Sequence, residues 1–289
     1  MLRCIVAVLT AIALVGCSAS SPHTHASSPR SSQHSTVDTP PIKGQQPAHV
    51  VVVVEENHGY HQIIGNPKAP YMNRLAHSGR LLTRMHAITH PSEPNYLALF
   101  SGSTHGLTDD SCPHTFAGPN IGAQLLEHHR TFVGYSQDLP QAGSTACSSG
   151  AYARKHAPWV NFSDLPAAQT SRPFSSFPSN YASLPTVSFV VPNLYKDMHS
   201  GSIASADAWL HNNLGSYPSW ARSHNSQLIV TWDEGESTNH IATIILGAGV
   251  TPGRDGQHAT LYSLLRLIET EYGVRPLGAA GNAAPISVH

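Results

Sequence analysis

Short runs of apolar residues alternate along this chain with segments in which apolar residues recur every three or four positions. The first run is five consecutive valines at 50–54. A continuous β-branched run is typical of a strand that is buried on both faces of a sheet. Similar runs predict strands at 131–135, 186–191, 228–232 and 241–246.

The segments between these runs have helical periodicity. In one of them, Ile203, Leu210 and Leu214 fall on one side of a helix. Helices are predicted at 69–77, 95–100, 121–128, 203–214 and 261–272. Strands that alternate with helices predict an α/β fold, a mostly parallel sheet sandwiched by helices. In such a sheet ligands bind beyond the carboxyl ends of the strands, so we expect the chemistry there.

The N-terminal segment has the pattern of an export signal. A positive start at Arg3 precedes an apolar run at 5–15, which is too short to span a bilayer. The run closes on Gly16-Cys17, an ending that resembles the lipobox of bacterial lipoproteins. Residues 1–17 are therefore predicted to be a lipoprotein-type signal peptide, with Cys17 as the lipid-attachment residue. The alternative is an ordinary secretory signal in which Cys17 happens to lie near the cleavage site.

Residues 18–47 are rich in Ser, Pro, Thr and His and contain almost no large apolar side chains. Such a segment cannot bury a core, so it is predicted to be a disordered tether. Residues 48–289 form the predicted catalytic domain and are long enough for a substantial core. We expect an exported protein, either a cell-surface lipoprotein held at the membrane by its lipid anchor or a secreted protein.

The overall charge gives no reason to expect a polyanionic partner. The formal net charge is -1 and only 11% of the residues are charged, so no nucleic-acid partner is expected. The 20 histidines are the outlier in composition. Most of them are attributed to surface loops, and only histidines inside ordered motifs receive a functional interpretation.

Two cysteines lie beyond the signal segment, Cys112 and Cys147. An even pair in an exported protein indicates a disulfide. A thiolate metal site is the alternative, but the pair lacks the C-x-x-C spacing of such sites.

Two of the predicted strands run directly into acidic residues. Glu55, Glu56 and Asn57 follow the valine run. Asp233 and Glu234 follow the strand at 228–232. Acids can simply mark where a strand returns to solvent, but oxygen ligands on two strand ends are what a divalent cation requires. A metal site is therefore predicted at this edge of the sheet, with the identity of the ion left open.

The segment HPSEPN at 90–95 lies between these strands. Pro94 suits the first turn of a helix, so Ser92 is placed just before or at a helix N-terminus, where backbone N–H groups favour phosphate. A hydroxyl beside a metal loses its proton readily and becomes a nucleophile. Asn95, one turn on, can donate to a phosphoryl oxygen. The alternative is that Ser92 only caps the helix, but the flanking acids favour the nucleophile.

These motifs resemble those of a known family. S-x-P-N at 92–95, followed by LALFSG at 97–102, resembles the nucleophile segment of alkaline-phosphatase-superfamily phosphodiesterases. VEEN at 54–57 resembles the Glu-Asn metal motif of the phosphoesterase family, which holds bacterial phospholipases C and acid phosphatases. With the segment at 152–162, the similarity covers most of the chain after residue 48. The resemblance implies an alkaline-phosphatase-like fold.

The resemblance also implies a set of site residues. Asp197 and His199 match an Asp-x-His segment, and His199 becomes a candidate for protonating the leaving oxygen or binding phosphate. Ser92 would bridge metal and phosphorus. The metal ligands of the family fall on Glu56, Asn57, Asp233 and Glu234.

One position departs from the family pattern. Relatives commonly have a histidine directly before Tyr-x-x-Leu in the last helix, where this chain has Leu261. His240 and His258 are candidates to compensate, and His90, near the predicted nucleophile, is a further candidate site residue. The departure leaves a second metal without sequence support.

The sequence predicts an exported, metal-dependent acid phosphatase that hydrolyses phosphate monoesters through a phosphoserine intermediate. By resemblance, the substrate is a phosphorylated small molecule or a phosphoinositide. A phospholipase C-type phosphodiesterase is an alternative use of the same residues. A histidine-rich metal-binding lipoprotein without catalysis is an alternative of another class, and it would have no need of Ser92.

Overall fold

The computed structural model describes residues 46–289, which belong to one structural unit. The predicted signal peptide with Cys17, and nearly all of the predicted tether at 18–47, lie outside the described residues. Each helix within 46–289 is too short or too polar to cross a membrane.

A nine-stranded sheet forms the centre of the fold. Its strands lie in the order β10-β2-β9-β8-β1-β7-β3-β6, and β11 pairs with β2. Neighbouring strands are parallel except at β9, which is antiparallel to both β8 and β2. The strands of this sheet are β1 (His49–Glu55), β2 (Arg80–His86), β3 (Phe132–Ser136), β6 (Ser171–Pro173), β7 (Val187–Val191), β8 (Ser226–Trp232), β9 (His240–Gly247), β10 (Gly253–Asp255) and β11 (Ala259–Thr260). A separate hairpin pairs β4 (Ser148–Ser149) with β5 (Tyr152–Ala153).

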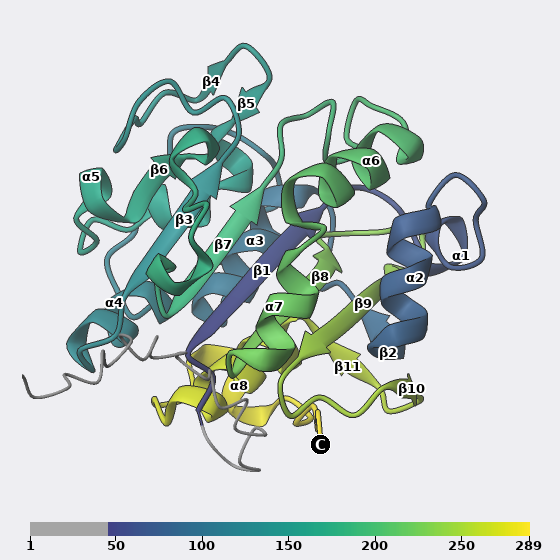
Figure 1. Cartoon of the computed structure of the whole chain (residues 1–289). Coiled ribbons are helices and arrows are strands. Elements are labelled where there is room, and N and C mark those ends of the chain that lie inside the picture. The colour runs from purple at the N-terminus through teal and green to yellow at the C-terminus, as the bar shows by residue number, and fades with distance from the viewer. Residues whose placement is uncertain (1–45) are drawn as a thin grey trace, which may run out of the picture. The chain divides into compact units, whose positions relative to one another are not determined.

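Helices cover both faces of the sheet (Figure 1). The face toward the viewer carries α2 (Pro70–Ser78), α6 (Ile203–Leu214) and α7 (Tyr217–Ser223). The other face carries α3 (Ser92–Ser101), α4 (Ile121–Glu127) and α8 (Leu261–Tyr272). Short helices α1 (Tyr60–Ile63) and α5 (Ala167–Thr170) lie toward opposite ends of the sheet, and the remaining 3-10 turns are Arg154–His156, Pro158–Asn161, Phe174–Ser176, Tyr181–Ser183 and Gly278–Asn282. The predicted α/β fold, with a mostly parallel sheet between helices, is confirmed.

Strand β1 shows how the valine run produces a core with two covered faces. Val50 to Val53 have no exposed surface, because helices pack against both sides of the strand. Its neighbours β7 and β8 are buried along their whole length. Full burial of one such side chain contributes about 1.5–3 kcal/mol. The centre of the sheet is therefore a firm base for the residues at its carboxyl ends.

The sequence prediction misses the short elements α1, α5, β4, β5, β6, β10 and β11, and it differs from the structure at three longer ones. Helix α3 begins at Ser92 rather than at 95, so Ser92 is its first helical residue. Strand β2 is not predicted, because an irregularity between Leu82 and Met85 interrupts its alternating pattern. Helix α7 is also not predicted, since its seven residues contain Pro218 and only three buried side chains.

Cys112 and Cys147 form a disulfide with their Cα atoms 5.9 Å apart, so the predicted pairing is confirmed. The bridge joins the loop after α3 to the start of the β4–β5 hairpin. The 3-10 turn Arg154–His156 follows this hairpin directly. The disulfide thus ties together two segments that reach the carboxyl edge of the sheet.

Candidate active site

The candidate active site lies at the carboxyl ends of the central strands, the upper edge of the sheet in Figure 1. Strands β1 and β8 are neighbours, and Glu55 stands opposite Trp232 in their register. The next residues, Glu56 and Asp233, therefore leave the sheet side by side. The backbone N–H of Asn57 donates to Asp233 Oδ1 at 3.1 Å, which ties the two strand ends together.

Ser92 lies against these acids at the N-terminus of α3. Its Oγ is 3.2 Å from Glu56 Oε2 and 3.5 Å from Glu234 Oε1. Pro91, not Ser92, occupies the N-cap position, and the cap has no side-chain hydrogen bond. The Ser92 hydroxyl is thus hydrogen-bonded to carboxylates. It lies at the helix end where the aligned peptide dipoles produce a partial positive charge.

Two residues outside the predicted set complete the surroundings of Glu56. Tyr96 donates a short hydrogen bond to Glu56 Oε1, and its ring stacks on His156 with the centroids 5.1 Å apart. His156 Nε2 lies 3.2 Å from Glu56 Oε1, and its Nδ1 lies 3.5 Å from Asp197 Oδ2. In the sequence, only the position of His156 within the segment at 152–162, which resembles the family, could have indicated its place in the site.

The loop after β7 carries Asp197 and His199. The Asp197 carbonyl accepts from the Glu56 N–H at 2.8 Å, and Asp197 Oδ1 accepts from the His199 N–H at 2.8 Å. Lys155 Nζ lies 3.2 Å from His199 Nε2 and 2.7 Å from Asp110 Oδ2. The sequence prediction misses Lys155, which brings a positive charge to this side of the site.

Burial and mutual repulsion perturb the acids. Burial raises the pKa of Asp233 to about 7, and the charge of Glu234 adds to the effect. Burial also raises the pKa of Asp197 to about 7. For Glu56, burial and then the charges of Asp233 and Asp197 hold the pKa well above its ordinary value. Carboxyls this close together can ionise together only beside a compensating positive charge.

The available donor atoms fit a divalent cation. Asp233 Oδ2 and Asp197 Oδ2 are buried and have no hydrogen-bond partner among the described residues. One ligand atom each from Glu56, His156 and His199 lie within 4.8 Å of one another. Burial holds the pKa of His156 well below its ordinary value, so its imidazole is neutral, as a metal ligand must be. Buried oxygens without partners, beside such a group of ligands, are what a bound cation would satisfy.

Asn95 does not fit the predicted role of a donor to phosphate. Its Oδ1 accepts from the backbone N–H groups of Ile88 and Thr89 at 2.9 and 3.0 Å. Its Nδ2 donates to the carbonyls of Thr89 and Pro91 at 2.8 and 3.1 Å. An amide nitrogen has two hydrogens, so no donor is left for a phosphoryl oxygen. Asn95 instead fixes the loop that presents Ser92.

His90 lies at the border of the site. Its Nδ1 is 2.7 Å from Glu234 Oε2, and its side chain is half exposed. This hydrogen bond and the charge of His90 lower the pKa of Glu234, but burial outweighs them and the pKa is raised. His90 therefore orients Glu234, which contacts the Ser92 hydroxyl.

His240 and His258 lie apart from the acids. His240 Nε2 is bonded to the Thr83 carbonyl at 2.9 Å, and His258 stacks on His86. No hydrogen bond or ion pair of the described residues links either histidine to the acids around Ser92. Leu261, where the family resemblance predicts a histidine, is fully buried. The geometry therefore does not support His240 or His258 as replacements for that histidine.

A mostly parallel sheet between helices, with a buried serine among acids at its carboxyl edge, gives this chain an alkaline-phosphatase-like fold. Solved structures share the fold at low sequence identity. One is a protein of the alkaline phosphatase superfamily from Vibrio parahaemolyticus, with TM-score 0.56 and 14% identity over 86% of this chain and 72% of that chain. Another is the phosphonate monoester hydrolase of Silicibacter pomeroyi, with TM-score 0.56 and 11% identity over 84% of this chain and 78% of that chain.

The model of the Phosphoesterase family matches residues 66–275. The chain belongs to this family and is a phosphoric ester hydrolase. It is 53% identical over 245 residues to the phosphatidylinositol-3-phosphatase of Mycobacterium tuberculosis, covering 83% of this chain and 82% of that protein. It is 29% identical over 229 residues to an acid phosphatase of Aspergillus fumigatus, covering 72% of this chain and 51% of that protein. The chain thus spans about half the length of this fungal relative.

Proposed function

We propose that this enzyme is a metal-dependent acid phosphatase that hydrolyses phosphate monoesters through a phosphoserine intermediate at Ser92. One observation carries the proposal: a buried serine hydroxyl at a helix N-terminus lies 3.2 and 3.5 Å from two carboxylates. The relatives named as a phosphatidylinositol-3-phosphatase and as acid phosphatases support this class of substrate.

The cation would be held by residues that surround Ser92. When bound, it would lower the pKa of the serine hydroxyl and stabilise the charge on the phosphoryl oxygens. The raised pKa values of Asp233 and Glu56 support this assignment, because a bound positive ion would offset the burial and the mutual repulsion that raise them. The proposed ligands are Glu56, Asn57, Asp233 and Glu234, with His156 beside Glu56 as a further candidate.

Ser92 supplies the nucleophile. Its Oγ forms a bond to phosphorus while the bond from phosphorus to the alcohol oxygen breaks, which leaves a phosphoserine and an alcohol. The hydroxyl proton passes to Glu56 or Glu234, the two carboxylates in contact with it. Water then attacks the phosphoserine, releases inorganic phosphate and restores the hydroxyl. The positive end of α3 favours the phosphoryl oxygens in both steps.

Lys155 and His199 complete the proposed site. Burial alone would lower the pKa of Lys155, but the hydrogen bond to Asp110 and the charge of Glu56 outweigh it and raise the pKa. Lys155 is therefore a cation available to the phosphoryl oxygens. Burial and the charge of Lys155 lower the pKa of His199, so His199 gains its proton only in acid solution. A protonated His199 donates to the leaving oxygen, which agrees with an acid phosphatase.

Asn95 and Asp197 take positioning roles in this proposal. Asn95 holds the loop before α3, and Asp197 holds both Glu56 and His199 through its own hydrogen bonds. Export also belongs to the proposal, either as a lipoprotein anchored through Cys17 or as a secreted enzyme. The disulfide supports it, since such bonds persist in oxidising compartments. A phosphoinositide is the proposed substrate, supported by the name of the relative that is 53% identical.

Turnover of p-nitrophenyl phosphate tests the proposal. Ser92→Ala is expected to lower kcat by about four orders of magnitude or more, as removal of a nucleophile does. Acid quenching of the wild type should trap one phosphoryl group on the peptide that contains Ser92. Ser101→Ala, at the other end of the same buried helix, is the matched control and should keep its activity. Substantial turnover by Ser92→Ala would reject the mechanism, and preference for bis(p-nitrophenyl) phosphate would favour the phosphodiesterase.

A further inference from the structure

A second ionisable cluster lies at the same edge of the sheet. Four histidines from three elements and a loop form a row: His61 of α1, His240 at the start of β9, His86 at the end of β2 and His258 just before β11. The centroids of successive rings are 5.5, 5.2 and 5.1 Å apart. These four residues are called the histidine row below.

Two arginines flank the histidine row. Arg254 Nη2 lies 2.9 Å from the Tyr60 hydroxyl, and the Tyr60 ring stacks on His240 with the centroids 4.7 Å apart. Arg84 lies close enough to His86 for its charge to act on that imidazole. Within residues 46–289, no carboxylate is within salt-bridge distance of either arginine or of any imidazole in the row.

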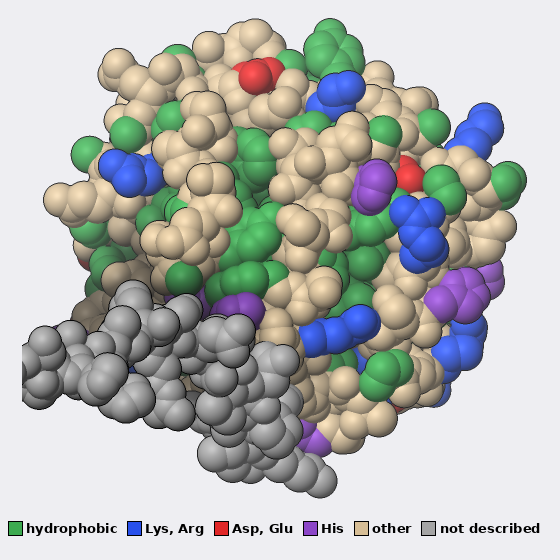
Figure 2. Space-filling model, viewed as in Figure 1, with side chains coloured by type: hydrophobic (Ala, Val, Ile, Leu, Met, Phe, Trp, Pro, Cys, Tyr) green, Lys and Arg blue, Asp and Glu red, His purple; other side chains and the backbone are tan. Residues whose placement is uncertain are grey.

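The elements around the row carry few acids. Residues 58–90, which supply α1, α2 and β2, contain no Asp or Glu but four Lys or Arg and five His. On the adjoining elements, Asp255 is paired with Arg80 at 3.0 Å, and Glu236 is exposed on the turn between β8 and β9. Figure 2 shows Lys, Arg and His side chains gathered along the side of the molecule where Figure 1 has α1, α2, β2 and β10. The row therefore lies in a region of net positive charge.

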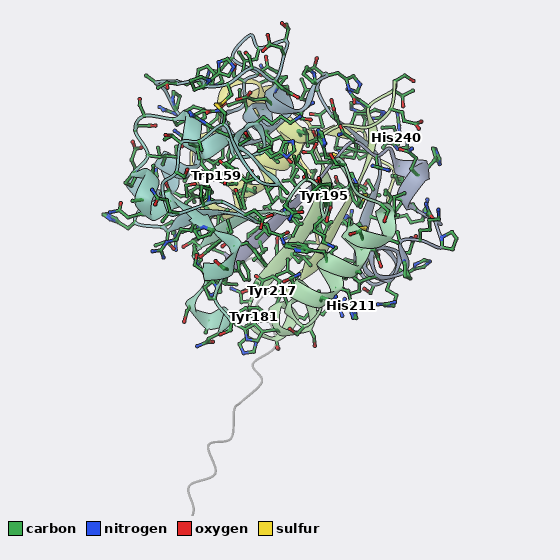
Figure 3. The ribbon with its side chains drawn as sticks, turned by 90° about the horizontal axis from the view of Figure 1, so that it is seen from above. Trp159, Tyr181, Tyr195, His211, Tyr217 and His240 are labelled. Atoms are coloured by element: carbon green, nitrogen blue, oxygen red, sulfur yellow. A yellow bond between two sulfur atoms is a disulfide. The ribbon has the colours of Figure 1, made fainter. Side chains whose placement is uncertain are left out.

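The row adjoins the catalytic acids. Strand β9 pairs with β8, and β2 pairs with β9, so the row begins one strand away, at a spacing of about 5 Å, from the strand that ends in Asp233. Figure 3 looks down on this edge and places His240 toward its rim, with the exposed Tyr195 of the His199 loop nearer the centre. A surface that touches the row would therefore face the same edge as the substrate of Ser92.

We propose that the histidine row and its two arginines dock the protein on an anionic phospholipid bilayer, and that docking strengthens as the pH falls. A single small anion would contact only one or two of the imidazoles. A row of four with flanking arginines presents charge along a line, which suits a surface that bears many phosphate groups. The inference rests on the proposed function only in that the docked membrane would bring phosphorylated lipid to the catalytic edge.

The expected pH dependence of docking follows from protonation of the imidazoles in the row. Imidazoles titrate between about pH 5 and 8. Each proton gained adds a positive charge that no carboxylate beside it neutralises, and neighbouring imidazolium rings repel one another. An anionic surface relieves this repulsion. One added charge at such a surface strengthens binding by about fivefold.

Co-sedimentation of the full chain with vesicles tests the proposal. Vesicles of phosphatidylcholine with phosphatidylserine are compared with phosphatidylcholine alone, at about pH 5 and about pH 7.5, on either side of the imidazole range. We expect binding to the anionic vesicles to be at least about fivefold tighter at the lower pH, and weak binding to the neutral vesicles at both. Arg84→Gln should weaken anionic binding about fivefold at both pH values.

Paired variants separate the row from other histidines. His61→Gln/His258→Gln removes two exposed imidazoles and should abolish most of the pH-dependent gain. His128→Gln/His129→Asn is the matched control, at the exposed end of α4, and should keep the gain. Asn suits position 129 because its φ is 57°. Any contribution of the N-terminal segment is common to all of these variants.

Two outcomes would overturn the proposal: a full pH-dependent gain in His61→Gln/His258→Gln, or equally tight binding to neutral vesicles. Turnover of soluble p-nitrophenyl phosphate separates this result from the proposed function. The row variants should turn it over like the wild type, because their residues do not contact the acids around Ser92. Ser92→Ala should lose turnover but bind anionic vesicles as the wild type does.

Discussion

The carboxyl edge of the sheet carries two clusters of ionisable residues, and they handle charge in opposite ways. In the acid cluster, Glu56 and Asp233 are 0% and 1% exposed. Water cannot support their charges, so burial raises their pKa values and ionisation requires a bound partner. The histidine row is in part open to solvent, with His61 and His258 exposed. Water supports its charges, and they remain available to a partner outside the protein.

The comparison shows that burial decides what kind of partner a cluster of like charges can have. A buried cluster suits one small ion of high charge, which must be held in close contact because the surroundings do not screen it. An exposed row suits a large and diffuse partner, because solvent and salt screen each charge beyond about 8–10 Å. Two neighbouring regions of one sheet edge can therefore serve catalysis and surface binding without competing.

Removing one charge from the acid cluster should produce the largest effect. Asp233→Asn is expected to lower kcat/KM by about a thousandfold, because one proposed ligand of the cation is lost. The same change should raise the thermal midpoint of protein kept in chelator, because one repelling charge is gone. Activity is thus expected to fall while stability rises, as at other active sites that hold unfavourable charge interactions.

Asp207→Asn is the matched control for this prediction. Asp207 is also buried, but its carboxylate accepts from the Tyr71 and Met72 N–H groups at 3.1 and 2.8 Å, in the first turn of α2. Because two backbone N–H groups stabilise the Asp207 carboxylate, Asp207→Asn should weaken these hydrogen bonds and lower the thermal midpoint. If Asp233→Asn also lowers the thermal midpoint in chelator, the carboxylates of the acid cluster do not destabilise one another.

The pH dependence of stability should be the next largest effect. The pKa values of Asp197 and Asp233 are raised from 3.8 to about 7. A carboxyl with a raised pKa adds stability below about pH 4 and loses it as the pH rises through about 7, because the folded state then binds more protons than the unfolded state. For one such carboxyl the loss is about 4 kcal/mol.

Urea unfolding over this pH range, with and without chelator, measures the effect. Stability in chelator should fall between about pH 4 and about pH 7, and a saturating divalent cation should reduce the fall. A stability in chelator that is flat or that rises across this interval would contradict the raised pKa values. Such a result would also mean that burial does not disfavour ionisation in the acid cluster, which is the main difference between this cluster and the histidine row.

The sequence predicts much of the acid cluster because its residues follow buried strands directly. Once the valine run and the run at 228–232 are assigned to a parallel sheet, their ends must meet at one edge, and Glu56 and Asp233 follow. His156 escapes prediction because a 3-10 turn without periodicity places it. Asn95 shows a different limit. Its side chain suits phosphate, but only the folded loop shows that both ends of its amide are already bonded.

The histidine row could not be predicted for another reason. Its members come from three elements and a loop. The strand that carries His86, β2, escapes prediction because an irregularity between Leu82 and Met85 interrupts its pattern. His86 and His240 meet only because β2 and β9 pair antiparallel in one register. The sequence prediction offered His240 and His258 as replacements for the histidine missing at Leu261, because the linear pattern does not show that they lie beside β2.

The smallest expected effect concerns the stability of the row itself. Burial lowers the pKa of His86 below its ordinary value of 6.5. A hydrogen bond to the Arg84 backbone opposes this shift, and the charges of His240, His258 and Arg84 add to it. The unfolded state then binds more protons than the folded state below about pH 6.5, so this imidazole makes the protein less stable as the pH falls. That dependence is opposite in sign to the one expected for the acids. His86→Gln should reduce the loss of stability in acid solution, by an amount typical of exposed charge pairs, about 0.2–1 kcal/mol.

Urea unfolding of metal-loaded protein at about pH 5 and about pH 7.5 measures this effect. His77→Gln, which removes an exposed imidazole outside the row, is the control. If His86→Gln and His77→Gln change the loss equally, the rings of the row do not repel one another, and their part in pH-dependent docking would have to come from solvent-exposed charge alone.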